Sequence, residues 1–313
     1  PRPLITTKDM LMNRREFLIS SAALAGSLAL SPGFPARALV STPAPRKLSV
    51  TSRILDINGR PATVYGLADA GGKSGLSFGP GERFHVDLEN RLAEETIIHW
   101  HGLIPPVEQD GVPNNPLPML KSGETRRYDF PIDAPGSYWM HAHTLQEQNL
   151  LAAPLIVRSA EDLKADMQEI VLLLHDFSFT PAEQLLADLN GGKAMDHGTM
   201  NHGDMGGMDM GGMDMSAMDH GDMGAMNHMG GMDLNDIQYD AYLANDRTLD
   251  DPEITQVDKG GRVRLRIING AASTAFSIST GALTAELVAV DGKPVFPVRA
   301  DLFPMSMGQR IDL

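Results

Sequence analysis

The 313-residue chain contains no cysteine, and this absence removes several kinds of chemistry at once. Disulfide bonds, thiolate metal ligands and cysteine nucleophiles are excluded within these residues. Aromatic residues make up only 5% of the chain, and no apolar run is long enough to predict a membrane-spanning helix. Positive charge is also scarce, because 26 lysines and arginines face 40 acidic residues, for a net charge of −14. Such a surface argues against a nucleic-acid partner and attracts cations.

The N-terminal residues have the pattern of an export signal. Arg14 and Arg15 precede a short stretch rich in alanine, serine and glycine, which ends in the A-x-A cleavage pattern at residues 36–38. Paired arginines in this place are typical of the twin-arginine pathway. We therefore expect residues 1–38 to be a signal peptide, the twin-arginine machinery to be a partner, and the protein to be periplasmic. A buried N-terminal helix is the alternative.

The rest of the chain predicts two similar all-β domains. Both ERFHVDLEN and GGRVRLRIIN alternate apolar and polar residues, as strands with one buried face do. The two segments align in register, with Gly81, Phe84, Val86, Leu88 and Asn90 matching Gly260, Val263, Leu265, Ile267 and Asn269. Residues 127–130 align in turn with residues 310–313. This repeat indicates tandem Greek-key β-sandwiches at 46–160 and 166–313, with chance similarity between amphipathic strands as the alternative.

The second predicted sandwich is shorter than the first at its C-terminal side. In the first domain, residue 130 is followed by two further apolar segments, whereas the second domain stops at Leu313. A sandwich without its closing strands leaves strand edges unpaired. We therefore expect the second sandwich to be partial and this sequence to be the N-terminal portion of a longer protein.

Two histidine pairs stand in apolar, tryptophan-containing segments. IIHWHGL contains His99 and His101, and YWMHAHT contains His141 and His143. Residues two apart on a strand point to the same face, so each pair can aim two imidazoles at one point. Neutral imidazole suits copper, zinc, iron or nickel, and four histidines in apolar surroundings need a shared partner. Metal ligation is therefore predicted, with hydrogen-bonded structural histidines as the alternative.

Two other histidines fit ordinary structural roles. His85 lies on the polar side of its predicted strand, which indicates a surface side chain. His175 follows the apolar run IVLLL, where a hydrogen-bonded residue at the end of a strand is the simpler interpretation. We therefore do not expect either of them to bind metal.

The histidine motifs resemble the N-terminal part of the multicopper oxidases. HWHG followed by YW-x-HAH carries the resemblance, and RIINGAAS, AVDGKPV and GQRIDL resemble the second domain of that family. The resemblance implies cupredoxin-like domains, a mononuclear type 1 copper and a trinuclear type 2/type 3 cluster. It also implies one-electron oxidation of substrates coupled to reduction of dioxygen to water. Copper is thus the expected cofactor, and dioxygen and a small-molecule or Cu(I) reductant are the expected partners.

The resemblance also assigns roles to single residues. His99 corresponds to a type 2 copper ligand, and His101, His141 and His143 correspond to type 3 ligands. Asp110, in EQDGVP, corresponds to an acid that delivers protons to reduced oxygen, although an Asp-Gly turn explains it equally well. The cluster of the family needs eight histidines, and its type 1 site needs a cysteine within an H-C-H motif. This chain supplies four histidines and no cysteine, so by itself it is expected to be inactive.

A methionine-rich segment interrupts the second predicted domain at residues 192–234. Between residues 195 and 232 it holds 12 of the 19 methionines, together with four histidines and six aspartates. No lysine, arginine, aromatic or branched aliphatic residue occurs there, so the segment cannot form a core and is expected to be disordered. Thioethers prefer Cu(I) and imidazole adds affinity for Cu(II). The expected copper-recruiting residues are Met195, His197, Met200, His202, Met205, Met208, Met210, Met213, Met215, Met218, His220, Met223, Met226, His228, Met229 and Met232.

Three functions follow from these observations. The first is an exported copper-tolerance oxidase that oxidises Cu(I) or phenols with dioxygen, as copper-tolerance members of the family with Met/His-rich insertions would. The second is a periplasmic copper-sequestering protein without turnover, which suits a chain that lacks the type 1 cysteine. The third is a scaffold that keeps the sandwiches without copper, and the intact histidine pairs count against it.

Overall fold

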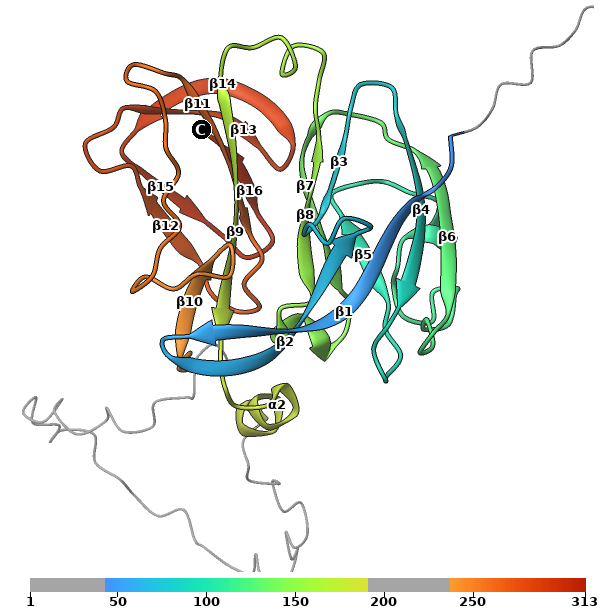
Figure 1. The fold of residues 1–313 in the computed structure, drawn as a ribbon. Coiled ribbons are helices and arrows are strands. Elements are labelled where there is room, and N and C mark those ends of the chain that lie inside the picture. Colours follow the sequence, from blue (N-terminus) through green and yellow to red (C-terminus); the bar gives the residue numbers. More distant parts are fainter. Residues whose placement is uncertain (1–42, 191–236) are drawn as a thin grey trace, which may run out of the picture. The chain divides into compact units, whose positions relative to one another are not determined.

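The computed structural model describes residues 43–190 and 237–313 (Figure 1). The expected signal peptide at 1–38 and the methionine-rich segment at 192–234 both lie outside the described residues. Within the described ranges, none of the helices combines the length and the apolar character that a membrane crossing needs.

The first part of the described chain forms two four-stranded sheets. One sheet has the order β2-β1-β4-β6, from β1 (Arg46–Ile57), β2 (Arg60–Asp69), β4 (Arg83–Asn90) and β6 (Thr125–Pro131). The other has the order β3-β8-β7-β5, from β3 (Leu76–Phe78), β5 (Ile98–His101), β7 (Gly136–Ala142) and β8 (Ala152–Val157). Two short 3-10 helices, η1 (Val107–Gln109) and η2 (Leu145–Asn149), flank the strands of the second sheet.

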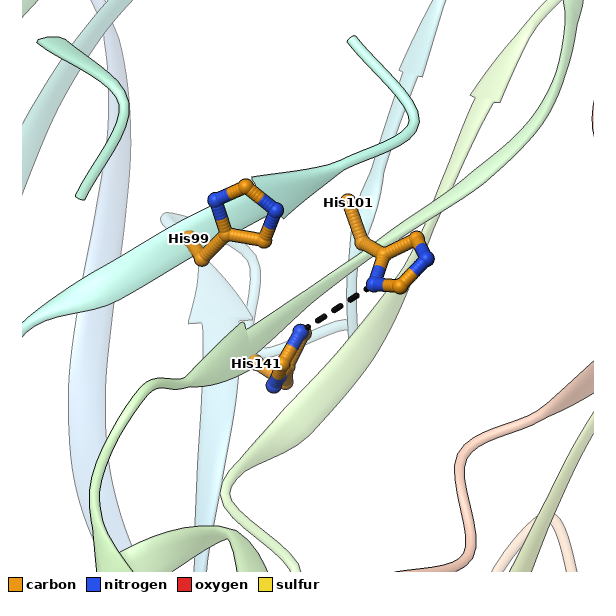
Figure 2. Close-up of side chains that lie close together, drawn as sticks. All are labelled: His99, His101 and His141. Carbon is orange, nitrogen blue, oxygen red and sulfur yellow. Dashed lines mark hydrogen bonds between the residues drawn. The ribbon is translucent and has the colours of Figure 1, made fainter. Parts of the chain in front are cut away.

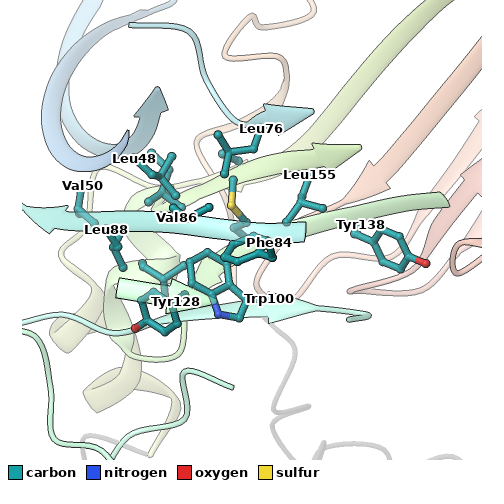
Figure 3. Close-up of a cluster of buried hydrophobic side chains, with 14 of the residues drawn as sticks. Leu48, Val50, Leu76, Phe84, Val86, Leu88, Trp100, Tyr128, Tyr138 and Leu155 are labelled. Atoms are coloured by element: carbon teal, nitrogen blue, oxygen red, sulfur yellow. The ribbon is translucent and has the colours of Figure 1, made fainter. Parts of the chain in front are cut away.

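The core of this first sandwich confirms the predicted alternation. Phe84, Val86 and Leu88 on β4 are all fully buried. Their side chains pack together with those of the facing sheet, among them that of Trp100 (Figure 3). The ring centroids of Phe84 and Trp100 are 4.5 Å apart. Aromatic rings bury large areas and pack at such distances, so β5, which carries His99 and His101, is fixed through its tryptophan.

The second part of the chain forms a six-stranded and a two-stranded sheet. The large sheet has the order β10-β9-β11-β16-β13-β14, from β9 (Gln168–Phe177), β10 (Ala241–Ala244), β11 (Val263–Asn269), β13 (Ala285–Val290), β14 (Lys293–Ala300) and β16 (Arg310–Asp312). The small sheet pairs β12 (Phe276–Ser279) with β15 (Leu302–Met305). A helix, α2 (Ala182–Leu189), follows β9. The fold of the described residues is thus all-β, as predicted.

The internal repeat appears in the strand pairing. In the first sandwich β4 pairs parallel with β1 and antiparallel with β6. In the second, β11 pairs parallel with β9 and antiparallel with β16. Asn90 ends β4 and Asn269 ends β11, and both side chains are fully buried. Each side-chain amide donates to two backbone carbonyls and accepts from the backbone N–H two residues later. The two domains therefore share the same strand arrangement, and in each of them an equivalent buried asparagine stabilises it.

The register of the repeat differs by two residues from the one that the sequence pattern suggested. The backbone N–H of Asn90 donates to Glu124, and that of Asn269 donates to Gln309. Arg310 therefore corresponds to Thr125, two positions before Arg127, the residue with which it was aligned. A slip of two residues keeps every side chain on its original face of the strand, so the alternating pattern could not reveal it.

Candidate metal centre

The four paired histidines come from two adjacent strands. β5 and β7 run antiparallel, with His99 opposite His141 and His101 opposite Trp139. Because residues two apart share a face, both histidines of β5 lie on the same side of the sheet as His141 (Figure 2). β7 ends at Ala142, so His143 lies one residue beyond the strand, where it is exposed. The strand pairing therefore brings together residues about forty positions apart in sequence.

The imidazoles converge on a common space. His99, His101 and His141 each offer one ring nitrogen, and these three atoms lie within 4.8 Å of one another. The ring centroid of His99 is 5.5 Å from that of His141 and 5.7 Å from that of His143. His143 is thus next to the cluster but outside the closest set of three. The structure places all four predicted ligands in one group.

Hydrogen bonds set the tautomers of two of these rings. Nδ1 of His99 lies 2.8 Å from the backbone carbonyl oxygen of Asp110, and Nδ1 of His141 lies 3.0 Å from that of Ala142. A carbonyl oxygen only accepts, so in both rings Nδ1 carries the proton and Nε2 keeps a lone pair. Nε2 of His141 is 3.3 Å from Nδ1 of His101. Two imidazole nitrogens at about 2 Å from one ion have about this separation in tetrahedral coordination.

The rings on β5 are neutral at neutral pH. Burial lowers the pKa of His99 below its usual range. Burial and the positive charge of Arg310 lower the pKa of His101 to about 3. Removing a histidine from water disfavours its charged form. Neutral rings offer the lone pairs that a metal ion needs, so this donor set fits an imidazole-binding metal such as copper.

Asp110 lies against His99, next to the Nδ1 nitrogen of its ring. Besides the backbone contact, its carboxylate Oδ1 is 3.3 Å from Nδ1 of His99, and its side chain is one-third exposed. The next residue, Gly111, has a φ of +80°, and a Cβ there would collide with the backbone carbonyl of Ile98. The Asp-Gly pair therefore forms a tight turn packed on β5, and the same turn sets the carboxylate beside a predicted ligand.

Tryptophan and the second sandwich enclose the site. The ring of Trp139 stacks on His141 with centroids 4.1 Å apart and lies 5.1 Å from the ring of His101. From the second sandwich, a Cβ added to Gly308 would lie 3.2 Å from Cε1 of His101. Arg310 is buried beside His101, and its Nε donates to the carbonyl of Ser137. Both sandwiches therefore contribute to the surroundings of the cluster.

Sequence reasoning missed two charged neighbours of the histidines. Oε1 of Glu147, in η2, lies 3.2 Å from Nδ1 of His141. Arg310 was used only for the repeat, although its guanidinium lies close to His101. Neither residue belongs to a spaced pair, so no sequence pattern pointed to them.

The two remaining histidines outside the methionine-rich segment stay away from the cluster. His85 on β4 faces Asp129 across the strand pair and is partly exposed. His175 on β9 is buried, and its Nδ1 donates to the carbonyl oxygen of Gly270 at 2.8 Å. The prediction of a hydrogen-bonded structural histidine is confirmed for His175.

An all-β protein whose adjacent strands gather four imidazoles belongs to the class of metal-binding β-sandwich proteins. Two family models described as multicopper oxidase match the chain, at residues 57–162 and 169–313. Together these matches span most of the described residues and include the whole histidine cluster. The chain therefore belongs to the multicopper oxidase family.

Individual relatives agree with this assignment. Copper resistance protein A of Escherichia coli is 31% identical over 96% of this chain and 52% of its own length. The multicopper oxidase MmcO of Mycobacterium tuberculosis is 29% identical over 74% of this chain and 44% of its own length. The solved blue copper oxidase of Nitrosomonas europaea superposes with a TM-score of 0.60 at 21% identity, over 85% of this chain and 73% of that one. The chain spans about half the length of the copper resistance relatives it matches.

Proposed function

We propose that this chain is part of a copper-dependent oxidase that couples oxidation of Cu(I) or phenolic substrates to the reduction of dioxygen to water. One observation carries the proposal, namely the three ring nitrogens of His99, His101 and His141 within 4.8 Å of one another. The family supports copper as the metal, and similarity to copper resistance proteins and to fungal laccases supports the two substrate classes.

The four histidines would hold the copper. His99 is proposed as a type 2 ligand, and His101, His141 and His143 as type 3 ligands. When bound, copper supplies the one-electron redox chemistry that joins substrate oxidation to dioxygen reduction. The chain itself contributes neutral imidazoles, and Trp139 covers one face of His141 and excludes water from it.

Asp110 is proposed to deliver protons. Its carboxylate is one-third exposed and lies 3.3 Å from a ligand histidine, so it lies between solvent and the site. A carboxylate in such a place can take a proton from water at Oδ1 and release it toward reduced oxygen. An Asp110→Asn variant should keep the turn and the copper while it slows dioxygen reduction. Loss of copper from that variant would instead show that the residue only positions His99.

The methionine-rich residues 195–232 are proposed to recruit Cu(I), with export by the twin-arginine pathway to the periplasm. These proposals rest on composition and on the arginine pair, because both segments lie outside the described residues. A chain that lacks residues 195–232 should bind fewer copper ions while the histidine site stays filled. Unchanged copper uptake would contradict a recruiting role.

Oxygen uptake tests the oxidase proposal directly. The copper-loaded full-length protein, of which this chain is proposed to be part, would be supplied with Cu(I) or a phenol in an oxygen electrode, with a His99→Ala/His101→Ala double variant as the control. Uptake that the double variant loses supports the proposal. The absence of cysteine favours a second candidate, a copper-sequestering protein without turnover. Stoichiometric copper binding at the histidines without oxygen uptake would select that candidate.

A further inference from the structure

A carboxylate lies close to the ring nitrogen of His141 that carries its proton. Nδ1 lies 3.0 Å from the carbonyl oxygen of Ala142, to which it donates, and 3.2 Å from Oε1 of Glu147. The negative charge of Glu147 beside Nδ1 favours the same tautomer as the carbonyl, with hydrogen on Nδ1. The lone pair is then left on Nε2, which faces Nδ1 of His101 at 3.3 Å.

The turn that carries Glu147 is tied to the first sandwich. Its first residue follows Thr144, whose hydroxyl oxygen accepts from the backbone N–H of Gln146. The side chain of Gln146 is buried and donates to the backbone carbonyl of Glu95. The backbone N–H of Glu147 donates to the carbonyl of Thr144 at 3.1 Å. Because the turn is fixed at these points, the carboxylate is set in place before any metal binds.

The charge of Glu147 acts on His141 and on no cation. Among residues 43–190 and 237–313, no lysine or arginine forms an ion pair with Glu147, and its side chain is about one-quarter exposed. A partly shielded carboxylate beside the protonated nitrogen of a ligand imidazole fixes the tautomer and the orientation of the ring. A second restraint on His141 is the ring of Trp139, which stacks on its imidazole. Stacking holds the plane of the imidazole but does not decide which nitrogen faces the site.

We propose that Glu147 is a positioning residue of the metal centre, which holds His141 with its Nε2 lone pair directed at the space shared with His101. Its carboxylate lies beside Nδ1 of His141 as the carboxylate of Asp110 lies beside Nδ1 of His99, so a ligand on each of the two strands has an acid next to it. The inference rests on the proposed function only in taking copper as the ion. It predicts that the orientation of His141 exists in the metal-free chain.

Three variants test the role of Glu147. Glu147→Leu removes both the acceptor and the charge, whereas Glu147→Gln keeps an oxygen acceptor without the charge. Glu161→Leu is the matched control, because that glutamate is exposed and forms no ion pair with any of the histidines that the structure describes. Nitrogen NMR of labelled histidine in the copper-free chain reports the tautomer of His141, and competition with a Cu(II) chelator reports the copper affinity.

The wild-type chain and the Glu161→Leu control should show the Nδ1–H tautomer and the same copper affinity. Glu147→Leu leaves the Ala142 carbonyl as the remaining partner of Nδ1, so it should raise the population of the minor Nε2–H tautomer and lose about 10- to 100-fold in affinity. Glu147→Gln should keep the tautomer and lose less affinity, and it carries the test if the leucine variant fails to fold. A leucine variant with the wild-type tautomer and affinity would overturn the proposal, as would a glutamine variant with unchanged affinity. If the wild type binds no copper but the tautomer of Glu147→Leu shifts, the positioning role stands and the proposed function fails.

Discussion

The two sandwiches have an ion pair at equivalent positions of two paired strands, but the acidic and the basic residue are exchanged between them. In the first sandwich Asp87 of β4 lies opposite Arg127 of β6. In the second sandwich Arg266 of β11 lies opposite Asp312 of β16. Asp87 and Arg266 each lie three positions before the buried asparagine that ends their strand. The repeat therefore keeps the position of the pair but not the identity of its charges.

The surroundings of the two pairs differ more than their geometry does. The partners of Asp87, which are Lys47 and Arg127, are each about 60% exposed. Arg266 and Asp312 are both almost fully buried, and the hydroxyl of Ser137 donates to Asp312 at 2.6 Å. Because Ser137 belongs to β7, the first sandwich covers the ion pair of the second. In one domain a buried Asp87 is thus paired with exposed cations, and in the other the equivalent pair is buried in the joint between the domains.

The largest effect should come from breaking the buried pair. Arg266→Met removes the nearest cation of Asp312 and one of the two cations of Glu169, and loss of one partner of a buried pair costs about 3–5 kcal/mol of unfolding free energy. Asp87→Asn should cost about 1 kcal/mol or less, because its exposed partners return to water. Unfolding in guanidinium chloride measures the free energy of unfolding of both variants.

A neighbour on the same strand supplies the control for this comparison. Arg264 is 23% exposed and lies 3.4 Å from Asp312, so Arg264→Met should cost under about 1 kcal/mol. If Arg266→Met and Arg264→Met lost the same stability, the buried pair would not be the joint between the sandwiches.

A glycine beside the metal centre should be the next most sensitive position. Gly102 follows β5 with a φ of +92°, and a Cβ there would collide with the guanidinium of Arg310 and lie 2.8 Å from Cδ1 of Tyr138. Gly102→Ala should therefore cost about 3 kcal/mol through strain and overpacking. Gly281 follows β12 in the second sandwich with a φ of +59° and open space around it, so Gly281→Ala should cost about 1 kcal/mol.

Thermal and chemical unfolding of both glycine variants would show the contrast. The same two variants also separate folding from metal binding, because only Gly102→Ala should displace Arg310 from His101. Equal costs for the two substitutions would mean that the contact between Arg310 and Gly102 is loose.

Replacement of either buried asparagine by alanine should lower the free energy of unfolding by the same amount. Removal of the Asn90 side chain takes a donor from the carbonyls of Glu94 and Leu120 and the acceptor from the buried N–H of Leu92. Removal of Asn269 does the same to Thr274, Ser306 and the N–H of Ala271. Unsatisfied buried polar groups make each alanine variant about 2 kcal/mol less stable. Urea unfolding of Asn90→Ala and Asn269→Ala checks this. Clearly different losses of unfolding free energy would show that the asparagine contributes differently to the stability of the two domains.

The frame and the ligand set could be predicted because both follow local rules. Alternation predicted the burial of Phe84, Val86 and Leu88, and the spacing of two predicted that His99 and His101 share a face. The match between Asn90 and Asn269 marked the repeat before any contact was known.

The rest depends on contacts that no local pattern encodes. The two-residue register difference leaves strand faces unchanged, so periodicity cannot detect it. Arg310 meets His101 only because two sheets distant in sequence pack together, and Glu147 meets His141 only through the path of η2. The opposite signs of Asp87 and Arg266 likewise became comparable only once the strand pairing was known.

The last effect we predict is the pH dependence of the metal-free chain, which is small near neutral pH and grows as pH falls. His101 has its pKa lowered to about 3 in the folded state, mainly by burial, whereas an unfolded histidine titrates near 6.5. Between these values the unfolded chain binds more protons, so the stabilising contribution is complete above about pH 6.5 and is lost as pH falls toward 3. Burial lowers the pKa of His99 and His175 as well, so these rings act with the same sign in both sandwiches.

Urea unfolding at several pH values should thus show stability that falls as pH drops below about 6.5. His101→Asn should make the decline shallower in the first sandwich, and His175→Asn should do the same in the second. Carboxylates such as Asp87, whose pKa its arginine and lysine partners lower, add a decline of the same sign at lower pH, so only differences between variants isolate each ring. A His101→Asn variant with the wild-type slope would mean that His101 is as well hydrated in the folded chain as in the unfolded one.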